Sequence, residues 1–233
     1  MDQKKHLAVI ALGGHAFLRH GHPCNHEEHE IAAAKISTLL MDLVEKDYNI
    51  IITHGNGPQV GALLLQNEGT QATVPMQPLD VLVAMTEGSL GYVMQQALLN
   101  ELGKRKIKRY VVTKITQVVV DENDAAFQIP TKPIGPFLSE EEAKRREQEL
   151  GWKIVEDSGR GWRRIVPSPI PLKVIQRHTI RDAANQGHIV IAAGGGGIPV
   201  AKRKDQHGHV KYVGVEAVID KDLTSSLLAQ EVG

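Results

Sequence analysis

Residues 50–61 read Ile-Ile-Ile-Thr-His-Gly-Asn-Gly-Pro-Gln-Val-Gly, and this stretch decides the fold class. Its apolar first part is typical of a strand buried on both faces of a sheet, and the glycines that follow indicate a tight turn. Two other segments share the design, because residues 7–12 lead into Gly13-Gly14 and residues 188–193 lead into glycines 194–197. Such strands favour a parallel sheet covered by helices.

Helical patterns lie between these strands. Residues 27–45 carry an apolar stripe, and Asn25 with Glu28 resembles a capping box at the start of that helix. The next helical pattern contains Gly88 and Gly91 as candidate breaks. The alternation of strands and helices predicts an α/β sandwich. The elements expected in addition are helices at residues 79–102 and 175–186 and one strand at residues 110–120.

The segment from about residue 121 to 171 differs from the rest of the chain. It is rich in proline, and residues 139–150 form a charged, helix-like stretch. We expect an insert that projects from the main sheet, with one amphipathic helix and short strands.

Bulk composition excludes several classes of protein. The chain has 233 residues with 27 Lys+Arg against 27 Asp+Glu, and this balance argues against a nucleic-acid surface. No stretch is long and apolar enough to span a membrane, and the short N-terminal apolar run ends in glycines, unlike a signal peptide. The single cysteine, Cys24, excludes an internal disulfide and fits a reducing cytoplasm.

The three strand–glycine turns point to an anionic ligand. Carboxyl ends of parallel strands meet at one edge of a sheet, where glycine lets backbone N–H groups approach a phosphate. Any single turn is equally well explained as a tight connection. The sequence has no G-x-x-x-x-G-K-[ST] phosphate loop, and the dinucleotide-binding pattern fails because Val60 stands where its third glycine is required.

Phosphoryl transfer also needs cations near the developing charge. Lys132, Arg160 and Lys221 are the candidates, although a lone lysine is most often a solvated surface charge. Prolines and a glycine frame the backbone around Lys132. Lys221 stands between Asp220 and Asp222 at an expected helix start, where the carboxylates can orient it or help to hold Mg²⁺.

Six motifs together resemble the carbamate kinases of the amino-acid kinase family. They follow that family's order over essentially the whole chain. The proline-rich motif Pro-Thr-Lys-Pro-Ile-Gly-Pro-Phe is the most specific, because it resembles the protruding subdomain that separates carbamate kinases from acetylglutamate, aspartate and uridylate kinases. The motifs are residues 11–14, 54–61, 130–137, 156–163, 194–199 and 218–222.

The resemblance implies a three-layer α/β/α sandwich around a mainly parallel sheet. Residues 1–233 would form one amino-acid kinase domain that is incomplete at its carboxyl end, with residues 121–171 as the inserted protruding subdomain. The implied activity is reversible phosphoryl transfer between ATP and carbamate, giving ADP and carbamoyl phosphate, with Mg²⁺. The implied protein is a cytoplasmic homodimer that acts on small molecules, without nucleic-acid or membrane partners.

The resemblance also implies roles for individual residues. Lys132 would reach into the site from the insert, and Lys221, set by Asp220, would stabilise charge on the nucleotide phosphates; these three are the catalytic candidates. No metal ligand is implied. The residues expected to bind substrate and phosphate are Gly13, Gly14, His15, Gly55, Asn56, Gly57, Gly194 and Gly195.

Two features depart from the family pattern. His15 stands where the family has asparagine, and its titration is expected to give catalysis a pH dependence. The family continues with adenine contacts and a further lysine beyond the position of Gly233. A chain ending there is therefore expected to bind carbamoyl phosphate or a similar anion but to hold ATP or ADP poorly.

A second hypothesis arises from five potential metal ligands in one short stretch. Histidine and cysteine are good ligands for Zn²⁺, Ni²⁺ or Cu²⁺, so a catalytically impaired relative that binds small anions or metal ions without turnover is the alternative function. The ligand spacing matches no standard motif, which favours a plain loop at the mouth of the site. The residues are His20, His22, Cys24, His26 and His29.

Overall fold

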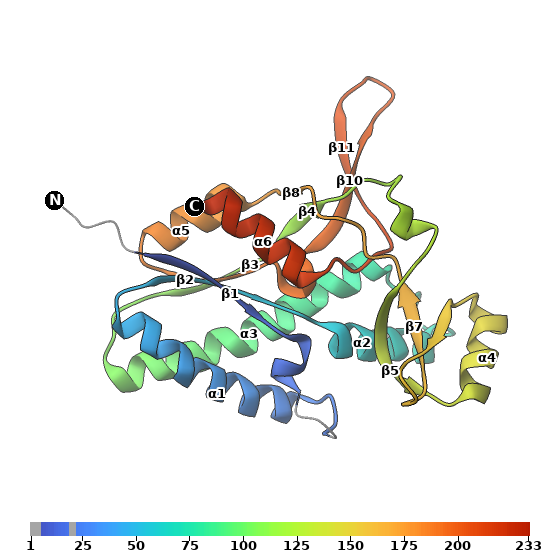
Figure 1. The fold of residues 1–233 in the computed structure, drawn as a ribbon, viewed down its shortest axis with the longest axis horizontal. Coiled ribbons are helices and arrows are strands. Elements are labelled where there is room, and N and C mark those ends of the chain that lie inside the picture. The colour runs from blue at the N-terminus through green and yellow to red at the C-terminus, as the bar shows by residue number, and fades with distance from the viewer. Residues whose placement is uncertain (1–5, 19–21) are drawn as a thin grey trace.

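A four-stranded parallel sheet forms the centre of the fold (Figure 1). The structure is a computed structural model that describes residues 6–18 and 22–233, with the side chain of His15 outside that description. The three expected glycine-terminated strands are present, and they share this sheet. Its strands, in spatial order, are β1 (Leu7–Leu12), β2 (Asn49–His54), β9 (Ile189–Ala192) and β3 (Val111–Lys114).

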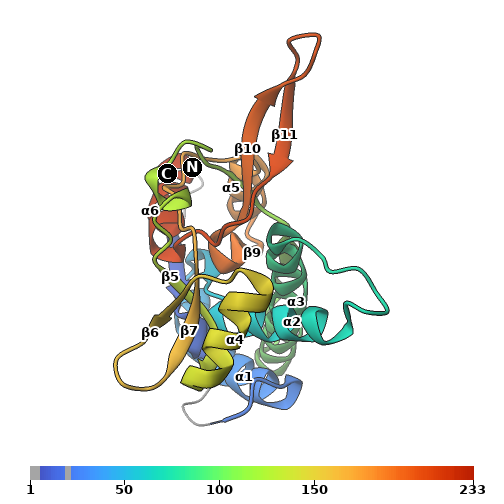
Figure 2. The ribbon, with the colours of Figure 1, turned by 90° about the vertical axis from the view of Figure 1, so that its right-hand side faces the viewer.

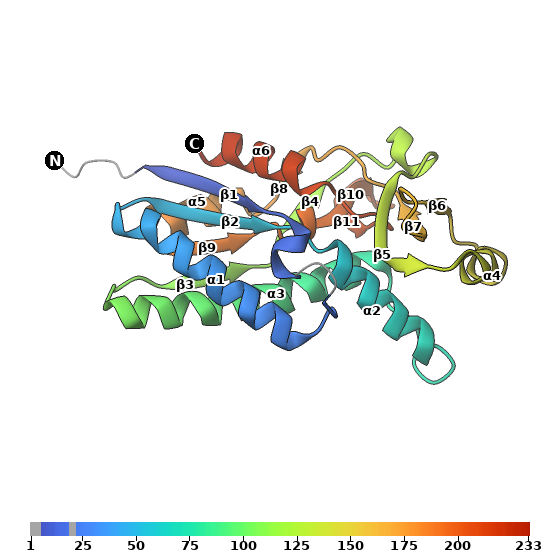
Figure 3. The same cartoon turned by 60° about the horizontal axis from the view of Figure 1, so that its bottom comes forward.

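Helices cover both faces of this sheet, as the continuous apolar strands predict (Figure 3). Ile50 and Ile52 of β2 pack against one helical layer, and Ile51 packs against the other, because successive side chains of a strand point to opposite faces. The expected α/β/α sandwich is confirmed. One layer contains α1 (His26–Glu45) and α3 (Leu79–Arg105), and the other contains α5 (Arg177–Asn185) and α6 (Lys221–Val232).

Two expectations about secondary structure are wrong in detail. Helix α3 runs without a break, because Gly91 serves a close helix–strand contact: a Cβ there would lie 2.4 Å from Thr113 Cγ2. The strand expected at residues 110–120 is two strands, since the chain leaves the first sheet after β3 and enters a second as β4 (Gln117–Val119). The Asn25 cap of α1 is confirmed, because its Oδ1 accepts from Glu28 N at 3.0 Å.

The second sheet contains a long hairpin that sequence reading does not predict. Strands β10 (Ile198–Lys204) and β11 (Val210–Gly214) pair antiparallel and project from the body (Figure 2). Strand β10 also runs parallel to β4, which pairs with β8 (Lys173–Val174). The hairpin therefore grows out of the body where the chain leaves the 3-10 turn η3 (Gly194–Gly196).

A third sheet stands apart from the other two, and we call residues 132–166 the arm. It is antiparallel, and the charged helix expected at residues 139–150 is confirmed as α4, which flanks it. The arm rests on α2 (Gly57–Thr70), where Gly61 and Gly135 cross so closely that a Cβ on Gly61 would lie 1.9 Å from Gly135 Cα. The arm contains β5 (Lys132–Leu138), α4 (Glu140–Leu150), β6 (Ile154–Glu156) and β7 (Trp162–Val166).

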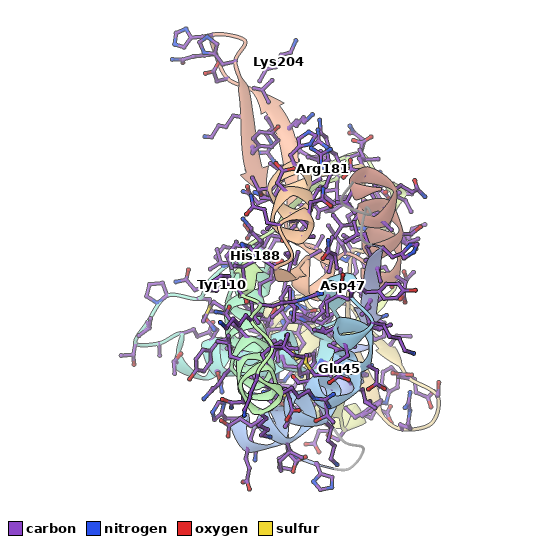
Figure 4. The ribbon with its side chains drawn as sticks, turned by 90° about the vertical axis from the view of Figure 1, so that its left-hand side faces the viewer. Glu45, Asp47, Tyr110, Arg181, His188 and Lys204 are labelled. Carbon is purple, nitrogen blue, oxygen red and sulfur yellow. The ribbon has the colours of Figure 1, made fainter. Side chains whose placement is uncertain are left out.

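The two edges of the central sheet differ in character. At the amino ends of the strands, the rings of Tyr110 and His188 meet edge to face, with centroids 5.5 Å apart, and Arg109 pairs with Asp47 at 2.8 Å (Figure 4). These contacts close off that edge with ordinary side chains. At the carboxyl ends, the chain turns through glycines instead. Within the described residues, no helix is long and apolar enough to cross a membrane.

Candidate functional site

The glycine turns meet at the carboxyl edge of the sheet, as expected from sequence. The N–H of Gly55 donates to Leu12 O at 2.9 Å, which places the turn after β2 beside the turn after β1. A cleft of about 180 Å³ opens there between the sheet edge, the arm and the start of α6. It is lined by Gly55, Asn56, Gly57, Pro58, Lys132, Pro133, Arg163, Gly195, Ile219, Asp220, Lys221 and Asp222.

Asn56 is buried beneath this cleft and held from α3. Its Nδ2 donates to Thr86 Oγ1 at 2.8 Å. Gly195 lies directly against it, because a Cβ on Gly195 would sit 2.2 Å from Asn56 Nδ2, and its φ of +66° favours glycine. The second and third glycine turns therefore form one packed unit.

The turn after β9 is fixed by hydroxyl groups from two other elements. Thr224 of α6 donates its hydroxyl to Gly196 O at 2.8 Å, and Thr116 Oγ1 accepts from Ala193 N at 2.9 Å. Ala193 has a φ of +51°, a left-handed conformation that is uncommon for a non-glycine residue, and these bonds stabilise it. The loop geometry is thus set before any ligand binds.

Lys132 reaches from the arm across the cleft to the start of α6. Its Nζ donates to Asp220 Oδ2 at 2.8 Å. Burial raises the pKa of Asp220, but the Lys132 ammonium and the backbone N–H groups of Asp222 and Leu223 outweigh it, so the net pKa lies below the usual range. Asp220 remains a carboxylate at neutral pH and orients Lys132.

Lys221 has a different partner from the one that sequence reading assigned. It was expected to be set by Asp220, yet its Nζ lies 2.5 Å from Asp222 Oδ1. Asp220 is occupied as the N-cap of α6, where Oδ1 accepts from Asp222 N at 2.8 Å, and as the partner of Lys132. Two lysines thus lie beside the N-terminus of an α-helix, an arrangement that attracts a multiply charged anion.

The first glycine turn lies next to this cleft. Gly13 is followed by the 3-10 turn η1 (Gly14–Phe17), and Gly13 O accepts from Ala16 N at 2.9 Å. The side chain of His15 lies outside the described residues. Gly194 does not line the cleft but packs behind Gly195, against His54 and Glu87.

Three residues near the cleft were not among the sequence candidates. Arg163 lines it and braces the arm, because its guanidinium donates to Gly135 O at 3.1 Å and pairs with Asp157 at 3.1 Å. His54 and Glu87 are buried beneath the third turn. The signal for Glu87 is a glutamate among otherwise uncharged neighbours in the first half of α3. The remaining candidate cation, Arg160, is 58% exposed and pairs with Asp157.

The cysteine–histidine stretch does not assemble into a metal site in the described part of the chain. His22 contacts Glu28 at 3.1 Å, and His26 contacts Glu30 at 3.3 Å, whereas Cys24 contacts His29 at 3.7 Å. Among residues 6–18 and 22–233, no three Cys, His, Asp or Glu side chains are arranged to hold a metal ion. His20, the remaining member, lies outside the described residues.

With this geometry in place, comparison with known proteins places the chain in a family. A sequence model described as the amino acid kinase family matches residues 6–233. The chain belongs to the amino acid kinase family. A carbamate kinase of Pyrococcus furiosus is 52% identical over 226 residues, which cover 96% of this chain and 70% of that protein. The resemblance seen in the motifs is confirmed.

Solved structures give the same result. A carbamate kinase from Giardia lamblia bound to citric acid matches with a TM-score of 0.91 and 39% identity, covering all of this chain and 73% of the other. The Giardia enzyme bound to AMP-PNP matches with a TM-score of 0.85 at 39% identity, covering 100% and 72% of the two chains. This chain therefore has the amino-acid kinase fold and spans about 70% of the length of these relatives.

Proposed function

We propose that the cleft catalyses reversible phosphoryl transfer between ATP and carbamate, giving ADP and carbamoyl phosphate. The observation that carries the proposal is the meeting of Lys132, from the arm, with Asp220 and Lys221 at the glycine-lined edge of the sheet. Phosphoryl transfer requires positioning and charge stabilisation and no covalent enzyme intermediate. The cleft offers both, and the relatives named above are carbamate kinases.

Each proposed role is the one that the family resemblance implies for the residue at that position. Gly13 and Gly14 face the transferred phosphoryl group, with His15 retuning this loop relative to the asparagine of the family. Gly55, Asn56 and Gly57 bind the carbamate end, and Gly194 with Gly195 supports the site. Lys132 neutralises charge that develops on the transferred group, with Asp220 orienting it, and Lys221 neutralises charge on the nucleotide phosphates. These roles rest on the contacts of Lys132, Asp220 and the glycine turns.

Mg²⁺ is proposed to enter with the nucleotide. Asp220 and Asp222 supply carboxylate oxygens of the kind that Mg²⁺ prefers, but each pairs with a lysine, and no third carboxylate of the described residues joins them. Mg²⁺ is usually held by one or two carboxylates together with substrate phosphates. The residues present fit a metal carried on the ATP phosphates, where it would neutralise their charge.

The test is ATP formation from ADP and carbamoyl phosphate by the complete native chain. Acetyl phosphate and aspartyl phosphate serve as competing acyl phosphates. We expect turnover with carbamoyl phosphate and at least roughly tenfold lower kcat/KM with the other two. Acetyl phosphate has a methyl group in place of the hydrogen-bonding amino group, and aspartyl phosphate is larger than the acceptor that the small cleft would hold. Equal turnover of all three phosphates, or none of any, would overturn the proposal.

The assembly is proposed to be a homodimer in the cytoplasm, built through α3 and β3. Met85, Tyr92 and Leu99 repeat every seven residues along α3 and are exposed, with Ile115 exposed nearby. Among the described strands, β3 lies at the edge of the central sheet. A second copy would cover this stripe. Light scattering should give a mass of two chains for the native protein and a mass of one chain for Tyr92→Lys. A Tyr92→Lys variant with the mass of the native protein would contradict this interface.

The segment of residues 121–171 is proposed to be the inserted subdomain implied by the resemblance. The arm at residues 132–166 is its structured part, because it contains a sheet of its own. Limited proteolysis should cut first within residues 121–131 or 167–171, leaving the central sheet intact. First cuts within the central sheet would contradict these bounds.

A further inference from the structure

Glu87 is a buried acid that the proposed chemistry leaves unused. It lies in the middle of α3 with 2% of its surface exposed. Its Oε2 accepts from Thr116 N at 2.8 Å, and its Oε1 is buried without a hydrogen-bond partner among the described residues. Burying a polar group without a full set of hydrogen bonds costs free energy. A buried Glu87 carboxyl group therefore indicates a role other than packing.

The position of Glu87 links it to the third glycine turn. A Cβ added to Gly194 would lie 3.0 Å from Glu87 Cγ and 2.6 Å from His54 Nε2, so both side chains border this glycine. The Thr116 that donates its N–H to Glu87 also fixes Ala193 through its hydroxyl. Glu87 therefore touches the loop on two sides, directly at Gly194 and through Thr116.

Among the described residues, no cation pairs with Glu87 to balance a charge. His54 is the titratable side chain that borders the same glycine, Gly194. The Nδ1 of His54 donates to Gly55 O at 3.0 Å, which leaves Nε2 as a bare acceptor. Burial raises the pKa of Glu87 well above its usual range, against the opposing effect of the Thr116 and Gly194 backbone amides. Burial without a balancing cation therefore favours the uncharged carboxylic acid.

We propose that Glu87 is a positioning residue that holds the glycine turn at residues 194–197 as an uncharged carboxylic acid, acting through the loop and not on the substrate. The acid supplies its carbonyl oxygen to the N–H of Thr116, which a glutamine amide can do equally well. Methionine has similar length and volume but cannot accept this bond. The link to turnover rests on the proposed kinase function, whereas the link to the loop does not.

The test compares Glu87→Gln and Glu87→Met with Glu101→Gln as the matched control. Glu101 lies further along α3 and pairs with Lys104 and Arg105. In the complete native chain, Glu87→Gln should keep kcat/KM for carbamoyl phosphate within roughly threefold, and Glu87→Met should lower it roughly 10²-fold because the loop is misplaced. Amide hydrogen exchange at residues 194–197 should accelerate only in Glu87→Met, whether or not the protein turns over carbamoyl phosphate.

A pH series separates a neutral acid from a charged one. When the pKa of a glutamate is higher in the folded state than in the unfolded state, the folded protein loses stability as pH rises above the unfolded-state pKa. Glutamine does not titrate, so the Glu87→Gln variant does not show this loss. The melting temperature of Glu87→Gln relative to that of the native protein should therefore increase as pH rises. The melting temperature of Glu101→Gln relative to the native protein should not increase. Loss of turnover in Glu87→Gln equal to that in Glu87→Met, or unchanged loop exchange in Glu87→Met, would overturn the proposal. Absence of kinase turnover with altered loop exchange would refute the proposed function alone.

Discussion

The carboxyl edge of the central sheet and the arm meet in one cleft, yet they are built on different physical principles. The sheet edge is buried, and its loops are held by backbone bonds, hydroxyls and neutral side chains. Gly194 and Gly195 leave no room for even one extra carbon. This region has one geometry available to it, which suits the recognition of a small anion.

Helix α4 of the arm carries a network of ion pairs. On helix α4, Lys144 pairs with Glu140, and Glu142 binds both Arg145 and Arg146. Arg146 also pairs with Glu68 of α2, and its guanidinium lies over the Trp152 ring. The more exposed pairs, Lys144–Glu140 and Arg145–Glu142, contribute little stability each. The sheet edge therefore provides shape and the arm delivers a cation, Lys132, while Ile134, Trp152 and Val166 of the arm are buried against α2 and α3.

Removal of that cation should give the largest effect. Lys132→Ala is expected to lower kcat by roughly 10²–10³-fold, about 3–4 kcal/mol of barrier, because a preorganised charge contact is lost. The melting temperature should barely change. Lys144→Ala removes an exposed lysine of the same arm that pairs with Glu140 and should leave kcat unaltered. Wild-type turnover of Lys132→Ala would show that the arm does not deliver the cation.

The sheet edge should respond to acid, because His54 is buried and neutral. Burial lowers its pKa from 6.5 to about 4, against the opposing bond to Gly55. A depressed histidine pKa makes the folded state lose stability as pH falls from 6.5 to about 4, here by roughly 3 kcal/mol. Urea unfolding from pH 7.5 to 4 should show this loss for the native protein and less of it for His54→Gln. Parallel curves would contradict it.

The junction between the two regions can be disturbed at one carbon. Gly61→Ala should destabilise by about 1–3 kcal/mol, because the new Cβ would overlap the backbone of Gly135 and lift the arm off α2. Gly69→Ala in the same helix has no atom within 4 Å of its new Cβ and should be neutral or stabilising. Denaturant unfolding of both variants measures the contrast. Equal effects would mean that the arm is not docked there.

The smallest effect is expected within the arm. Ser139 caps α4 by accepting from Glu142 N at 3.2 Å. Ser139→Ala should cost about 1 kcal/mol of local stability, seen as faster amide exchange in α4, with turnover unchanged. Slower turnover in this variant would show that the arm's helix also shapes the cleft.

Sequence reading could predict what depends on local patterns. The three glycine-terminated strands, the layers that cover them and helix α4 follow from apolar periodicity and turn residues. The motifs also indicated Lys132, Asp220 and Lys221, which the fold brings to one cleft. The pairing of Asp220 with Lys132, 88 residues away, depends on tertiary structure and has no local signal.

Other features were hidden for the same reason. The strand pattern of residues 110–120 is continuous, but the chain passes from one sheet to another within it. At that point Thr116 N donates to Glu87, and Thr116 Oγ1 accepts from Ala193 N, so Thr116 bonds to the site in place of a neighbouring strand. Gly91 was read as a helix break, although its role is contact with Thr113 across the layers. Both errors arise where packing overrides local propensity.

The most direct test of one shared site is amide hydrogen exchange of the complete native chain with and without carbamoyl phosphate. We expect residues 54–57 and 194–196 at the sheet edge and the backbone around Lys132 in the arm to become protected together. The β10–β11 hairpin tip at residues 205–209 should not change. Protection of the sheet edge without the arm, or protection confined to the hairpin, would contradict the account.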